Sequence, residues 1–155
     1  YKCSCCVNII INYLKIKKME EKYLYFRTQA NVDNDDGIDD SVYVPASSIT
    51  GLVPTSTTAL TIFFESVKNN PGFAGGTNEE VIRDSVVLNC TAGKVKQVMQ
   101  KIVRVINSTY PLYNDGVITI ADDVTTNLAN ETVSAVYIDS GITSCGAITV
   151  AAALS

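Results

Sequence analysis

The residues with the greatest capacity for chemistry are the acids of one short stretch, residues 31–40 (NVDNDDGIDD), which crowd around Gly37. Hard cations such as Ca²⁺ prefer carboxylate and amide oxygens of this kind. When Gly37 is placed at the sixth position of an EF-hand loop, Val32 stands where the first Asp belongs and Tyr43 where the final Glu belongs. The remaining spacing would allow Asn34, Asp36 and Asp40 to hold a weakly bound Ca²⁺. We favour the alternative, a solvated turn that keeps an edge strand soluble, and predict no metal site.

The chain contains no histidine, which excludes two common ways of activating a nucleophile. In Ser-His-Asp and Cys-His sites an imidazole must take the proton. Zinc would depend on Cys and carboxylates alone, and Cys90 and Cys145 lie in separate apolar runs, which predicts small buried hydrophobic residues. The pair Gly75-Gly76 lacks the Gly-Lys-Ser/Thr ending of a phosphate-binding loop. We expect no cofactor.

Paired carboxylates are the remaining route to catalysis, and Asp122 and Asp123 at a strand end are the candidates. Adjacent residues of an extended strand point to opposite faces of the sheet. The two carboxylates would therefore not converge on one substrate, and we predict a protein without enzymatic activity.

The charge balance is acidic, with a formal net charge of −4 for the whole chain. From Met19 onward, 8 Lys and Arg residues stand against 16 Asp and Glu residues. Such a balance opposes non-specific binding to nucleic acid and to anionic membranes. The densest basic cluster lies on one predicted helix and comprises Lys94, Lys96, Lys101 and Arg104.

The character of the chain changes at Met19, because residues 1–18 contain four Lys, no acid and three of the five Cys. The lysines follow the apolar stretch and no small-residue cleavage site comes after it, so a secretory signal is disfavoured. The stretch is also shorter than the roughly 20 apolar residues of a membrane span. We interpret residues 1–18 as a non-native upstream reading frame or a disordered segment. Residues 19–155 are then expected to form a single domain.

Short runs rich in Val, Ile, Thr and aromatic residues predict strands, separated by turns rich in Gly, Pro, Asn and Asp. The predicted strands are 21–28, 41–45, 59–67, 84–91, 117–121, 133–139 and 147–153, and 49–53 would extend the second. Residues 54–58 and 141–146 are predicted turns, and 68–80 a polar loop.

Residues 93–107 form the one convincing helix. Its apolar residues recur at helical spacing and predict a stripe that packs on a sheet; they are Val95, Val98, Met99, Ile102, Val103 and Ile106. Thr91 is the expected N-cap, and Pro111 blocks continuation. The predicted fold class is therefore mainly β (α+β), a small β-barrel or sandwich with one amphipathic helix at about 93–107.

Four segments resemble a small protein family known from marine metagenomes and attributed to cyanophages. They are MEEKYLYFRT, DDGIDDSVYVPASSITGLVPTSTTAL, TAGKVKQVMQKIVRVIN and DGVITIADDVTT, and the resemblance covers essentially Met19 to the C-terminus. The family is described as Sm-like: a strongly bent, five-stranded antiparallel SH3-type barrel that assembles into rings through edge strands. The resemblance implies a single Sm-like β-barrel domain over 19–155 and a homo-oligomeric ring.

RNA binding is the usual implication of an Sm fold, and here the sequence departs from the pattern. RNA-binding Sm proteins use an Asp-x-x-Asn type loop and a later Arg-Gly pair that stack and hydrogen-bond a base. This chain has no Arg-Gly dipeptide, and its arginines are Arg27, Arg83 and Arg104. RNA binding rests on fold analogy alone and is disfavoured by the acidic charge.

The leading hypothesis is a non-enzymatic, self-assembling Sm-like phage protein that serves as a virion structural or assembly component. Its partners would be copies of itself and other virion proteins, with no membrane contact, in the virion or the host-cell cytoplasm. The first alternative is an Sm-like RNA-binding protein acting in the infected host cell. The second is calcium-dependent adhesion through residues 33–40.

Overall fold

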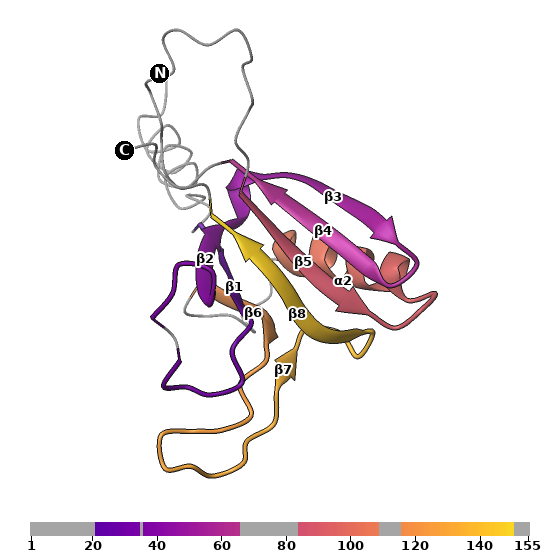
Figure 1. Cartoon of the computed structure of the whole chain (residues 1–155). Coiled ribbons are helices and arrows are strands. Elements are labelled where there is room, and N and C mark those ends of the chain that lie inside the picture. Colours follow the sequence, from indigo (N-terminus) through magenta and orange to yellow (C-terminus); the bar gives the residue numbers. More distant parts are fainter. Residues whose placement is uncertain (1–20, 35, 66–83, 109–115, 151–155) are drawn as a thin grey trace, which may run out of the picture.

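The computed structural model describes residues 21–34, 36–65, 84–108 and 116–150, so the predicted upstream segment lies outside the described residues. Within them, eight strands form two four-stranded sheets, and one α-helix lies behind the second sheet (Figure 1). The elements are β1 (Tyr23–Arg27), β2 (Ser41–Pro45), the 3₁₀ turn η1 (Ala46–Ser48), β3 (Ile49–Ser56), β4 (Ala59–Phe64), β5 (Asp84–Cys90), α2 (Val95–Ile106), β6 (Val117–Asp122), β7 (Val136–Tyr137) and β8 (Ile142–Thr149).

The first sheet has the strand order β2-β1-β6-β7, and the second has the order β3-β4-β5-β8. Pairing is antiparallel except between β1 and β6, which run parallel. The described strands form no closed barrel. The mainly β class with one helix is confirmed, whereas the expectation of a wholly antiparallel barrel is wrong. A parallel pair is possible because the chain passes through β2, the second-sheet strands β3, β4 and β5, and the helix before it returns beside β1.

The alternation in β1 explains how the two faces of the first sheet form. Leu24 and Phe26 are completely buried, while Tyr23 stays 43% exposed on the opposite face. A register shift against β6 falls between Tyr25 and Phe26, and Arg27 is buried as well. A shift of this kind adds a residue to one strand and breaks the strict alternation of faces.

The helix α2 buries Val95, Val98, Ile102 and Val105. The predicted stripe is thus correct in five members, since Met99 and Ile106 also pack half-buried against the core, and it is wrong in Val103, which is 44% exposed. Val105 takes its place because an ideal helix turns 100° per residue, which puts residue 105, and not 103, in line with 95, 98 and 102. The exposure of Val103 leaves an apolar side chain on the outer face of the helix.

The two ends of α2 are held in different ways. The expected N-cap, Thr91, is wrong: Lys94 is the N-cap and makes no side-chain cap bond, while Lys94 N donates to Thr91 O at 3.0 Å. At the other end, Lys22 Nζ donates to the carbonyl oxygens of Val105 (3.1 Å), Ile106 (2.8 Å) and Ser108. An ammonium group is favourable at the negative end of a helix dipole, so Lys22 fixes α2 to the start of β1.

Two strands differ from their predicted positions. Residues 49–56 do not extend β2; the turn η1 separates them, and they pair with β4 as β3. The predicted turn 54–58 therefore shrinks, since β3 continues to Ser56. Similarly, β8 begins at Ile142 and runs through the predicted turn 141–146. Polar and Gly-rich residues are tolerated there because β8 lies at the end of its sheet.

No helix within the described ranges has the length and apolar character needed to cross a membrane.

Candidate functional site

The acidic stretch folds as a turn that is closed by one of its own carboxylates. Asp40 Oδ2 accepts a hydrogen bond from Gly37 N at 2.7 Å, and Asp40 Oδ1 accepts one from Gln29 Nε2 at 2.5 Å. A Cβ on Gly37 would collide with the Asp40 carboxylate, so glycine is required for this approach. Both Asp40 oxygens already accept bonds from the chain, which gives this side chain a structural role.

The other two predicted calcium ligands do not join Asp40 in that turn. Asn34 and Asp36 are exposed. Among the described residues, no group of three or more Cys, Asp or Glu side chains lies close enough to hold a metal ion. The geometry of the described residues therefore does not bring the three calcium candidates together.

The acidic turn is joined to a second loop, and we call the two together the double loop (residues 28–34, 36–40 and 123–135). Asn31 and Thr126 form a β-bridge, and both Thr125 N and Thr126 N donate to Ala30 O, at 2.7 and 3.0 Å. The buried Arg27 side chain holds the base, donating to Gln29 O at 3.1 Å and Asn31 O at 2.9 Å. The double loop projects beyond the sheets at the lower left of Figure 1.

Asp122 and Asp123 turn to different partners, as the sequence predicts for adjacent residues. Asp122 Oδ1 accepts from Val124 N at 3.1 Å and shapes the chain after β6. Asp123 accepts from Tyr137 Oη at 2.8 Å and from Cys145 N, at 2.9 Å to Oδ1 and 3.0 Å to Oδ2. Asp123 thereby joins the end of the first sheet to β8 of the second.

Burial controls the protonation of this cluster. It raises the pKa of Asp123, against the lowering effect of the hydrogen bonds from Cys145 and Tyr137. Burial, followed by the nearby Asp123, raises the pKa of Cys145 to about 12 and that of Tyr137 to about 12. At neutral pH the thiol and the phenol therefore stay protonated, and neither is activated as a nucleophile or a base.

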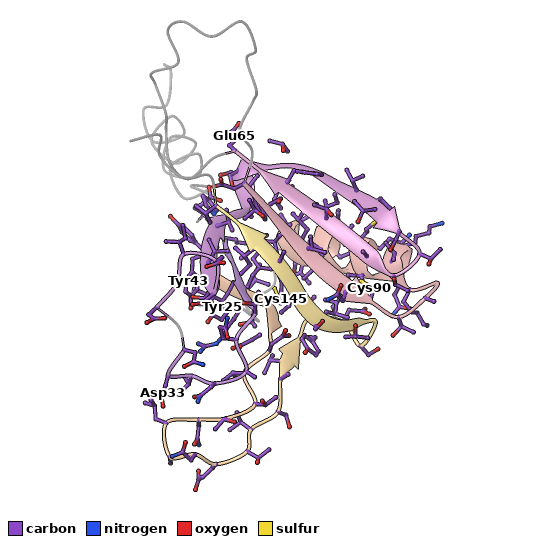
Figure 2. All side chains as sticks on the ribbon, in the orientation of Figure 1. Tyr25, Asp33, Tyr43, Glu65, Cys90 and Cys145 are labelled. Atoms are coloured by element: carbon purple, nitrogen blue, oxygen red, sulfur yellow. The ribbon has the colours of Figure 1, made fainter. Side chains whose placement is uncertain are left out.

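The other cysteine among the described residues is buried as well. Cys90 is 4% exposed, and burial, followed by the charge of Asp139, raises the pKa of its thiol. The prediction that Cys90 and Cys145 are small buried residues is confirmed, since both are buried and free. Figure 2 shows them at separate places, Cys145 near β8 and Cys90 near the end of β5.

Two surfaces stand out on the described part of the chain. On the first sheet, Tyr25 and Tyr43 stack with ring centroids 4.5 Å apart, and Tyr43 is 55% exposed (Figure 2). On the outer side of α2, the exposed residues include Lys96, Gln100, Val103 and Arg104.

A shallow, open groove beside the start of α2 is lined by Pro54, Ser56, Thr57, Gly93, Val95, Lys96 and Met99. Lys96 is the only ionisable residue among those that line this groove, so the lining contains no pair of an acid and a base.

A scan against protein-family models, a search of curated proteins and a search of solved structures found no match for this chain. Its function must therefore be inferred from its own surfaces.

Several of the contacts that shape these surfaces were not predicted from the sequence. The hydrogen bonds from Lys22 to the end of α2 join residues more than eighty positions apart, and no local sequence pattern predicts them. Tyr137 and Cys145 are the hydrogen-bond partners of Asp123. Only their position in apolar runs indicated that they are buried. The tyrosine stack had a visible signal, because the alternation in β1 and β2 puts Tyr25 and Tyr43 on one face of neighbouring strands.

Proposed function

We propose that this protein is a non-enzymatic, self-assembling component of a phage particle, related to the Sm-like proteins. The observation that supports self-assembly is the pair of edge strands β2 and β3. Each lies at the end of its sheet in the described part of the chain, and η1 joins them directly. An unpaired strand edge offers backbone donors and acceptors to another chain.

The edge of β3 has a defined usable length. Pro54 has no backbone N–H, and the register against β4 shifts between Pro54 and Ser56. Both features blunt the far end of β3. The register also shifts between Ile49 and Gly51 at the near end, which leaves Gly51–Val53 as the regular segment for pairing. Val53 is 44% exposed in this segment, so a docking strand would also bury an apolar side chain.

The opposite ends of the two sheets are less available. β7 has only two residues. The Cys145 N–H of β8 is already bonded to the Asp123 carboxylate. If β2 of one copy pairs with β3 of another copy, the two copies contribute different surfaces to the contact. A non-symmetric contact of this kind gives a ring when it closes.

The absence of enzymatic activity in this proposal rests on the protonation states described above. Asp123 is bonded to two structural partners, and the Cys145 thiol is buried and protonated. The assignment to a phage particle rests on the resemblance of the sequence to the cyanophage-attributed family.

Edge pairing can be tested with Val53→Lys, because a charge on an edge strand opposes the docking of a further strand. We expect the wild-type full chain to form a defined oligomer in light scattering. We expect the Val53→Lys variant to give a lower mass than this oligomer. Val53→Thr, which keeps β-branching, serves as the control. An unchanged oligomer in Val53→Lys would contradict edge pairing through β3. Mass spectrometry of purified cyanophage particles would then test the location, with the polypeptide expected among the virion proteins.

RNA binding is the second candidate, and the stacked Tyr25 and Tyr43 favour it, since exposed aromatic rings can stack on bases. The charge near them does not help, because the ammonium of Lys22 is engaged by the end of α2. Titration with uridine-rich and adenosine-rich oligonucleotides tests this function. Binding that weakens with salt and is lost in Tyr43→Ala would support it, and no binding at low salt would exclude it.

A further inference from the structure

The outer face of α2 is positively charged over its whole length. Lys96 and Arg104 lie on this face with the exposed Val103 between them, and Lys94 and Lys101 flank it. The helix contains no acidic residue. Within the described residues, Lys96, Lys101 and Arg104 form no ion pair or side-chain hydrogen bond, so their charges are free to meet a partner.

The charge at the start of α2 is unfavourable in the isolated subunit. Lys94 and Lys96 stand at the positive end of the helix dipole, where acids are preferred. The first turn has no acid, and the N-cap makes no side-chain cap bond. The carboxylate of Asp139 accepts from Gln97 Nε2 at 3.0 and 3.3 Å, and Lys94 Nζ donates to Gln97 Oε1 at 3.2 Å, so Asp139 offsets part of the charge at Lys94. Carboxylates brought in by a partner would offset the charge that remains at Lys96, which favours an acidic occupant for the face.

The double loop of the same protein has the complementary character. Asp33, Asp36 and Asp39 are exposed, and their carboxylates accept no hydrogen bond from the described residues. Two apolar side chains stand out beside them: Ile38 is 59% exposed and Leu128 is 76% exposed. An acidic surface with apolar tips matches a basic face that also exposes Val103 beside Arg104.

The double loop is also held in a fixed shape, which a docking element requires. Val32 N donates to Thr126 O at 3.2 Å, and Val133 N donates to Thr125 O at 2.9 Å. Asn127 Oδ1 accepts from Ala129 N and Glu131 N, each at 2.9 Å. Preorganised loops lose less conformational entropy on binding than mobile ones.

The two complementary surfaces cannot meet within one copy. Figure 1 shows the double loop at the lower left, beyond β7, and α2 behind β4 and β5 on the other side of the molecule. We propose that copies dock head to tail, with the double loop of one copy on the basic outer face of α2 of the next. The proposal rests on the self-assembly proposed above and names the contact that would orient the copies. A contact between two different surfaces generates a ring when it closes.

A nucleic acid is the other occupant that a basic face would attract, and the observations favour a second copy. From Met19 onward acids outnumber bases two to one, which repels a polyanion at long range. The acidic double loop, by contrast, is present on every copy at the same concentration as the basic face.

Reciprocal charge reversal tests the proposal on the full chain. One variant carries Lys96→Glu, Lys101→Glu and Arg104→Glu, and the other carries Asp33→Lys, Asp36→Lys and Asp39→Lys. Each variant has two like-charged surfaces, so we expect its apparent dissociation constant to rise about 100-fold or more. In a 1:1 mixture the two variants can alternate so that every contact again joins opposite charges, and an assembly with an even number of copies should return in light scattering. The control Lys15→Glu/Lys17→Glu/Lys18→Glu makes the same change in net charge as the α2 variant and should assemble as the wild type does.

The outcomes separate this proposal from the proposed function. Recovery of an assembly only on mixing supports head-to-tail docking, and it shows that both variants are folded. Variants that assemble like the wild type would overturn the docking and leave edge-strand assembly standing. A mixture that stays dissociated would also overturn the docking. Loss of binding to a uridine-rich oligonucleotide in the α2 variant, with unchanged assembly, would assign the face to nucleic acid and also overturn it. A wild-type monomer at every protein concentration would instead overturn the proposed function.

Discussion

Tyr137 donates its phenolic hydrogen to the Asp123 carboxylate across 2.8 Å. The same carboxylate accepts the backbone N–H of Cys145, so one side chain at the end of β6 binds both β7 and β8. The two sheets are tied together at this point by a polar cluster in addition to the apolar core. Four predictions test the contacts that hold the subunit together.

Removal of the Asp123 carboxylate should destabilise the fold. Asp123→Ala leaves Tyr137 Oη and Cys145 N without their acceptor, and we expect a loss of about 1–3 kcal/mol in the free energy of unfolding by urea. Asp123→Asn keeps an acceptor oxygen and should cost less, because burial already raises the pKa of Asp123 and disfavours its charged form. An Asn variant as unstable as the Ala variant would contradict this account.

Alkaline pH should weaken the same cluster. The pKa values of Cys145 and Tyr137 are raised from 9.0 and 10.0 to about 12, so the unfolded chain loses these protons first. The stabilisation is complete below pH 9 and is lost as the pH rises towards 12. The urea midpoint should therefore fall from pH 9 upward, and less steeply in Tyr137→Phe than in the control Tyr43→Phe. A midpoint that is the same at pH 8 and pH 11 would exclude the effect.

Calcium should leave the thermal stability unchanged. Both oxygens of Asp40 accept bonds within the turn, from Gly37 N and Gln29 Nε2. We expect the same melting temperature in millimolar CaCl₂ and in excess chelator, and a lower one in Asp40→Ala because the turn loses its closing bonds. A rise of several degrees in the melting temperature with calcium would instead support a calcium site at Asn34, Asp36 and Asp40.

Loss of the Lys22 ammonium should loosen α2. Lys22→Met removes the donor to Val105 O and Ile106 O and should cost about 1–2 kcal/mol in urea unfolding. Lys22→Arg keeps a positive charge and donors at this helix end, so its loss should be smaller. Equal stability of Lys22→Met and the wild type would show that the contact contributes nothing.

The elements that depend on local pattern could be predicted from the sequence. The stripe of α2 and the alternation of β1 fix which side chains are buried, and the β2 bounds, Ser41–Pro45, agree with prediction. Val103 was misplaced because two adjacent apolar residues, Ile102 and Val103, both fit the helical spacing. The sequence predicts residues 49–53 as an extension of β2, because the local pattern does not reveal the bend at η1.

The sites depend on contacts between distant positions and were less predictable. The divergence of Asp122 and Asp123 follows from strand geometry alone, and the structure agrees. The partners of Asp123 depend on the packing of β8 against the end of the first sheet, which no local pattern specifies. The joining of the acidic turn to residues 123–135 is likewise non-local, since Asn31 bridges Thr126 across the sheet end.

Self-assembly is the central claim, and the mass of the full chain in solution tests it most directly. Size-exclusion chromatography with light scattering, at several protein concentrations in about 150 mM salt, should give one defined mass that is a multiple of the 16.7 kDa chain. A single species of 16.7 kDa at every concentration would contradict the account.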